Sequence, residues 1–154
     1  MLFTAYLPPA RQHHNNNPVV LASMSRNCGS FVVKAHVTAV IDGPKATVQT
    51  PDENVVFYAY IPEDNTTFGG SSLSIKDFSL IKFEVKDQQR MVNTATVSAW
   101  GSSSGVDGKS AQNFTSEKVK PGIYKIIPIK PLPLGEYAFQ QLGSYFDFGV
   151  VANQ

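Results

Sequence analysis

The sequence predicts an all-β fold, an antiparallel β-sandwich of the immunoglobulin-like type with about seven to nine strands and no substantial helix. Two observations lead to this prediction. Short segments that alternate apolar and polar residues recur along the chain, separated by Gly, Pro, Asn and Asp, and a period of two is typical of strands that bury one face. No segment of about ten residues shows the periodicity of an amphipathic helix.

The clearest strand is the segment 31–41, in which every second residue is apolar: Phe31, Val33, Ala35, Val37, Ala39 and Ile41. Turn residues follow at 42–44, and the alternating segment 45–50 is predicted to form a hairpin with the first strand. Segment 55–61 is β-branched and aromatic, which predicts a central strand. On that strand Tyr58 and Tyr60 lie on the face opposite to Val55, Phe57, Ala59 and Ile61.

The middle of the chain predicts a long polar loop at 62–74, a single helical turn at Ser74–Asp77 and a second hairpin. The first strand of that hairpin places Ile81, Phe83 and Val85 on one face, and a loop of three or four residues separates it from the next strand. The second strand, 90–100, is predicted to direct four residues inward: Met91, Ala95, Val97 and Ala99.

The last third predicts a loop at 101–110, a weak strand around 114–119 and three further strands, at 123–129, 136–142 and 145–151. Before the second of these, Leu132, Gly135 and Tyr137 have the arrangement of a tyrosine corner. In such a corner the tyrosine hydroxyl binds a backbone carbonyl a few residues upstream, where the chain passes between sheets.

Residues 31–154 are predicted to form the sandwich domain, and residues 1–30 an N-terminal arm that is mostly irregular. Within the arm only Val19–Ala22 predicts a short strand. The first residues lack the cationic start and apolar stretch of a secretory signal, so we expect a cytoplasmic protein, or an envelope or secreted one whose export signal is missing.

Composition argues against several classes of partner. Thirteen basic and twelve acidic residues leave a net charge of +1, and no basic cluster is present, which argues against nucleic acid binding. No apolar run approaches the roughly 20 residues of a membrane-spanning helix, and the run 126–129 is broken by Pro128. Cys28 is the only cysteine, so an intramolecular disulfide is excluded.

No motif predicts catalysis, a cofactor or a metal ion. The histidines, His13, His14 and His36, lack the spacing of metal ligands, and segment 103–110 ends like a phosphate loop but precedes a predicted strand instead of a helix. The candidate carboxylates for acid–base chemistry are Asp52, Asp64, Asp77, Glu136 and Asp147. Asp147 faces away from its two Phe neighbours, and we expect a solvated or hydrogen-bonded side chain.

Three C-terminal segments, 120–125, 131–139 and 146–150, look like the signature of a group of bacterial proteins that is frequent in acidobacterial genomes. Their sequences are KPGIYK, PLPLGEYAF and FDFGV. Segments 45–50 and 56–60 also resemble that group, so the similarity covers roughly residues 35 to 150. The resemblance implies a bacterial all-β fold and brings no activity, cofactor or site residue with it.

These observations favour a non-catalytic interaction or structural module, self-associating or associated with the cell envelope. The arm or a sheet edge would pair with a protein partner or with a second copy. A carbohydrate-binding or other ligand-binding sandwich is the alternative, with Tyr58, Tyr60 and Trp100 as the contact residues. An enzyme whose site is assembled from loop carboxylates is the second alternative.

Overall fold

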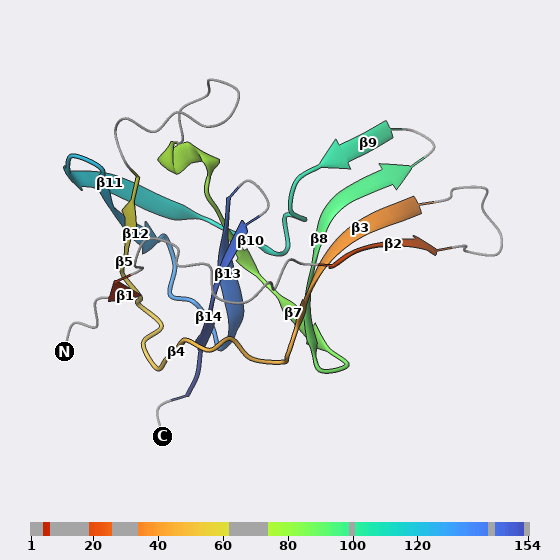
Figure 1. Ribbon diagram of the computed structural model, residues 1–154, viewed down its shortest axis with the longest axis horizontal. Helices are drawn as coiled ribbons and strands as arrows, with labels where there is room; N and C mark the ends of the chain where they lie inside the picture. The colour runs from red at the N-terminus through yellow and green to blue at the C-terminus, as the bar shows by residue number, and fades with distance from the viewer. Residues whose placement is uncertain are drawn as a thin grey trace.

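The computed structural model describes residues 5–6, 19–25, 34–61, 74–98, 101–141 and 144–152. In these residues fourteen strands form three sheets, and the one helical element is a single 3-10 turn, η1 (Ile75–Asp77), as predicted (Figure 1). The prediction of an all-β, antiparallel sandwich-like fold is confirmed. The strands outnumber the predicted seven to nine partly because the chain passes repeatedly from one sheet to another.

The first sheet, called here the β5 sheet, has the order β1 (Ala5–Tyr6), β5 (Phe57–Tyr60), β12 (Ile123–Pro128), β11 (Phe114–Lys120). β1 pairs with β5 in parallel, and the other pairs are antiparallel. The predicted central strand is confirmed, because β5 lies between two others and Val55, Phe57, Ala59 and Ile61 are buried.

The second sheet, the central sheet, has the order β10 (Ala111–Gln112), β6 (Ser79–Lys82), β13 (Gly135–Gln141), β14 (Ser144–Val150), β4 (Gln49–Thr50). The third, the β3 sheet, has the order β2 (Val19–Ser25), β3 (Lys34–Asp42), β8 (Gln89–Ser98), β7 (Glu84–Lys86), and β9 (Gly101–Ser104) also pairs with β8.

The central sheet is covered on both faces. Leu80 and its neighbour Ile81 point to opposite sides of β6: Leu80 packs in a cluster with Phe57 and Ile126 of the β5 sheet, and Ile81 in a cluster with Ile41 of the β3 sheet. Figure 1 shows the same order, with β13 and β14 between β5 and β12 on one side and β3 and β8 on the other. The described strands therefore form three layers.

Single residues carry the chain from one sheet to the next. Phe83 separates β6 in the central sheet from β7 in the β3 sheet, and Asn113 separates β10 in the central sheet from β11 in the β5 sheet. The predicted alternation through Val85 is wrong for this reason. Val85 is 46% exposed, because β7 lies outside the central sheet, against the end of β8.

The hairpin predicted between segments 31–41 and 45–50 is also wrong. β3 pairs with β2 and β8, and β4 pairs in parallel with β14 of another sheet. Ala46 begins this departure, because its backbone N–H donates to Oε2 of Glu136 at 2.7 Å instead of pairing with β3. Alternation in the sequence identified the strand residues but not their partners.

β8 contains an irregularity that changes which residues face the core. Its register with β3 shifts at Thr94, so that Val37 pairs with Ala95 whereas Thr38 pairs with Asn93. Val92 is consequently 3% exposed and Met91, expected inside, pairs with Val40 on the other face. The prediction for Met91 is wrong because one extra residue reverses the alternation.

The predicted loop before β8 is a two-residue turn, with Asp87 and Gln88 both at positive φ.

The described parts of segment 1–30 are strands of the domain. β1 pairs with β5, and β2 pairs with β3 over seven register positions, so the strand predicted at Val19–Ala22 is confirmed and extends to Ser25. The rest of the predicted arm, including His13, His14 and Cys28, lies outside the described residues, as does most of the predicted loop 62–74.

The tyrosine corner is confirmed. The hydroxyl of Tyr137 donates to the carbonyl oxygen of Pro133 at 2.5 Å, and the Tyr137 ring stacks against Phe148 in the core. Burial, with a smaller contribution from the nearby Glu53 carboxylate, raises the pKa of Tyr137 to about 12. The hydroxyl therefore keeps its proton and its hydrogen bond at a pH where an ordinary tyrosine ionises.

This shift predicts a loss of stability at high pH. Below pH 10, the pKa of Tyr137 in the unfolded chain, its contribution to the free energy of unfolding is complete. Between pH 10 and the folded pKa of about 12, the unfolded chain loses the proton that the folded chain retains, and this contribution falls. Tyr137→Phe should cost about 1 kcal/mol in free energy of unfolding at pH 8. That cost should disappear by pH 11, in urea titrations at both pH values.

Tyr124→Phe, which leaves the corner intact, should keep the wild-type pH dependence. A Tyr137→Phe cost that is equal at both pH values would contradict the assignment.

Candidate functional site

Two of the three aromatic residues predicted to bind a ligand lie together on the outer face of the β5 sheet. The Tyr60 side chain is 61% exposed and Tyr58 is half-buried, whereas Phe57 and Ala59 between and beside them are buried against the central sheet. The register places Tyr58 opposite Lys125 and Tyr60 opposite Ile123. Tyr58 and Tyr60 therefore lie on the face opposite to the buried residues of β5, as predicted.

Trp100, the third predicted contact residue, lies outside the described residues. The strands on either side of it, β8 and β9, belong to the β3 sheet, and their residues Ser98 and Gly101 are register partners. Tyr58 and Tyr60 belong to the β5 sheet, on the other side of the central sheet. The described strands thus give no support for a single surface that contains all three residues.

A buried ionic network, which the sequence did not predict, joins the β3 sheet to the central sheet. Arg90 of β8 is 3% exposed; its Nη1 donates to Oδ2 of Asp147 on β14 and lies 4.0 Å from Oε2 of Glu136 on β13. Its Nε donates to the carbonyl oxygen of Gly43 at 3.0 Å. Asp147 is therefore hydrogen-bonded, as predicted, on the face opposite to Phe146 and Phe148.

Glu136 extends this network into the chain between β3 and β4. Its carboxylate accepts hydrogen bonds from the Ala46 backbone and from Nε2 of Gln49, the second at 3.3 Å. Gln49 lies directly against Gly149, where any side chain would collide with the Gln49 amide. The network resembles an active site in composition, but Arg90 lies between the two carboxylates, and each carboxylate accepts a hydrogen bond. Its role is to hold two sheets together.

The remaining candidate carboxylates have local structural roles. Asp77 accepts from the Ser74 backbone at 2.8 Å and completes the capping box of η1. Asp52 accepts from the Asn54 backbone at 2.8 Å in a turn. Asp64 lies outside the described residues. The structure therefore brings Glu136 and Asp147 together, and does so around an arginine instead of around an open site.

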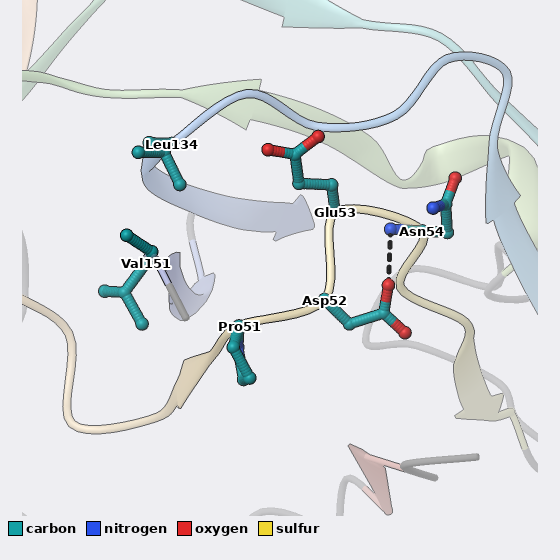
Figure 2. A pocket seen from close by; sticks show the side chains of 7 residues that line it. Pro51, Asp52, Glu53, Asn54, Leu134 and Val151 are labelled. Carbon is teal, nitrogen blue, oxygen red and sulfur yellow. Dashed lines mark hydrogen bonds between the residues drawn. The ribbon is translucent and has the colours of Figure 1, made fainter. Parts of the chain in front are cut away.

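One shallow pocket of about 350 Å³ lies where the β4–β5 connection meets the tyrosine corner (Figure 2). Pro51, Asp52, Glu53 and Asn54 line one side, and Leu134, Val151 and Ala152 the other. Figure 2 shows the Asp52 carboxylate turned to the backbone N–H of Asn54 rather than toward a second carboxylate. The pocket offers apolar contacts and two exposed acids on one loop, which is not the paired geometry of general acid–base catalysis.

The β3 sheet provides a larger candidate surface, because it extends beyond the core. Its contact with the central sheet ends at Ala39 and Val92, which are 2% and 3% exposed, whereas the next pair, Val37 and Ala95, is half-buried. In Figure 1, β2, β3 and β8 run on past the central sheet on the side away from the β5 sheet. This part of the sheet has no sheet packed on it among the described strands.

The extended part has apolar residues at alternating register positions. Continuing from Ala39, every second register position along the three strands holds an apolar residue. We call these residues the distal face: Val20, Ala22 and Met24 on β2, Ala35 and Val37 on β3, Ala95 and Val97 on β8. The positions between them are mostly polar, with Ser23, His36 and Thr96 aligned in one row. The alternation of apolar and polar residues therefore continues beyond the region that the core buries.

Two further classes of site are absent from the described residues. No group of three His, Cys, Asp or Glu side chains in the described ranges has the arrangement of a metal site. No helix within those ranges is long and apolar enough to cross a membrane.

The ionic network predicts a large stability effect at Arg90. Arg90→Met leaves Glu136 and Asp147 without their cation, and the free energy of unfolding in urea should fall by about 3 to 5 kcal/mol. The triple variant that also carries Glu136→Gln and Asp147→Asn should recover most of this loss, because no unpaired charge remains. Lys86→Met, on an exposed part of the adjacent strand, is the control and should change stability by no more than about 0.5 kcal/mol. Equal effects at positions 90 and 86 would contradict the role assigned to Arg90.

Comparison of the chain with protein-family models, with curated proteins and with solved structures gave no match. The similarity of segments 120–125, 131–139 and 146–150 to a bacterial group stays a prediction.

Proposed function

We propose that this chain is a non-catalytic interaction module that binds a protein partner, or copies of itself, through the β3 sheet. The observation that carries the proposal is the distal face. A β-sheet with one apolar face needs a second layer. In the described structure the central sheet supplies that layer only as far as Ala39 and Val92.

The roles of the charged residues in the part of the chain that the structure describes agree with the same proposal. Glu136 and Asp147 are held by Arg90, and the described pocket has adjacent acids on one loop. An apolar surface beside polar rows is instead the pattern of a protein-binding surface, where apolar area supplies the free energy and polar neighbours supply specificity.

A pair of neighbouring residues on β8 tests the proposal. Ala95→Glu places a charge on the distal face, and Thr96→Glu places the same charge on the opposite face of the same strand. We expect Ala95→Glu to abolish assembly in light scattering behind size exclusion, or, if the isolated chain is monomeric, to reduce its binding of a hydrophobic dye such as ANS severalfold. Thr96→Glu should leave both properties unchanged.

A monomeric chain that binds no dye would contradict the proposal, as would equal effects of the two substitutions. Circular dichroism of both variants checks that each still folds. Point variants are preferable to removal of residues 1–30, because that truncation also removes β1 and β2 and exposes β3 and β5.

Ligand binding at Tyr58 and Tyr60 is a second candidate function, favoured by the position of the Tyr60 ring. Gly122, at φ +72°, lies next to this ring: a Cβ at position 122 would be 3.4 Å from Cε2 of Tyr60 and 3.0 Å from the Ile61 carbonyl oxygen. The ring is thus exposed beside a position that leaves room for it, and an exposed ring suits stacking on a sugar.

This candidate predicts that Tyr60→Ala lowers the affinity for a bound glycan at least tenfold on a glycan array, while Val85→Ala, at an exposed apolar position on another sheet, leaves it unchanged. An array on which the intact chain binds no glycan would exclude the candidate.

A further inference from the structure

The sheet edges of this domain are protected unequally. An exposed edge strand can pair with another chain, and proteins limit this with short edge strands and with charged residues. β1, β4 and β10 have two residues each. The edge strand β11 carries Glu117, Lys118 and Lys120, and the edge strand β7 carries Glu84 and Lys86.

β2 has neither kind of protection. It is seven residues long, with the sequence VVLASMS, and contains no charged residue and no proline. Among the described strands it pairs only with β3, so that its other edge has no strand partner in the part of the chain that the structure covers. Of the described edge strands longer than four residues, β2 and β11, only β2 is uncharged, and β2 is therefore the edge best suited to accept another strand.

We infer that the strand added to β2 is β2 of a second copy, paired antiparallel about a two-fold axis. This inference rests on the proposed function and names its partner. Because β2 carries no charge, pairing it with itself brings no like charges together. A two-fold pairing also closes after two copies, so it gives a dimer and not an open fibre.

The sequence of β2 suits a pairing centred on Ala22. In that register Ala22 lies opposite Ala22 of the second copy, and Val20 opposite Met24, so the small residue is at the axis and apolar residues flank it. These are the β2 residues of the distal face. The dimer joins the two β3 sheets into one sheet and the two distal faces into one apolar surface.

Two sets of variants at position 22 test this dimer. In the Cys28→Ser chain, Ala22→Cys should give a disulfide-linked dimer on mild oxidation, because directly opposed residues of antiparallel strands have Cα atoms about 4.5 to 5.5 Å apart, within the range of disulfides. Ser116→Cys on the exposed edge strand β11 is the matched control and should remain largely uncrosslinked. Light scattering of the unmodified chain should give twice 16.8 kDa.

Charge complementation provides a test that does not depend on oxidation. Ala22→Lys and Ala22→Glu each bring like charges together at the axis and should each be monomeric. An equimolar mixture of the two should recover the dimer mass, because unlike charges then face each other. The recovery also shows that neither variant has failed to fold.

The outcomes separate this inference from the proposed function. If the Ala22→Lys and Ala22→Glu variants remain dimeric and Ala22→Cys does not crosslink, the inference is overturned. The proposed function then stands, with self-association through another surface. A monomer whose dye binding depends on Ala95 overturns the inference and leaves a different protein as the partner. A monomer without dye binding overturns both.

Discussion

A guanidinium buried between two sheets must find anionic partners, because an unpaired charge in that position is strongly destabilising. Arg90 finds them in Asp147 and Glu136 of the central sheet, and it also binds the carbonyl oxygen of Gly43. Glu136 in turn holds the backbone of Ala46. One side chain thus fixes the distance between two sheets and the path by which the chain leaves β3, and the arrangement of the β3 sheet depends on it.

Arg90 lies at one end of the contact between the β3 sheet and the central sheet. It pairs with Ile41, and the next row on the same face contains Ala39 and Val92, which belong to the cluster against the central sheet. Beyond them the strands continue with the same apolar spacing but without that layer. The two ends of the β3 sheet therefore differ: one end is held to the central sheet by charges, and the other extends beyond the central sheet.

Much of the fold follows from local patterns. Alternation and turn residues identified β5, β12, β13 and β14, and the Leu132–Tyr137 segment identified the tyrosine corner, because these features depend on neighbours in sequence. The hairpin at 31–50 was mispredicted because the partner of Ala46 is 90 residues away. Met91 was placed on the wrong face because one extra residue in β8 reverses the alternation. Alternation in 31–41 revealed the apolar stripe of the distal face, but only the packed sheets show where the core stops covering it.

The ion pair between Arg90 and Asp147 has a further consequence for how the chain reaches its native state. Its two residues are 57 positions apart, and the Ala46–Glu136 bond spans 90. Contacts between residues so far apart in sequence form slowly, because the chain loses conformational entropy on closing the loop before the contact stabilises it, as is general for β topologies. During synthesis β2, β3 and β8 emerge before either carboxylate exists, so the uncharged edge strand is complete while the central sheet is not. An uncharged edge strand that is complete before the rest of its domain is a site where nascent chains associate, and we expect β2 to be such a site.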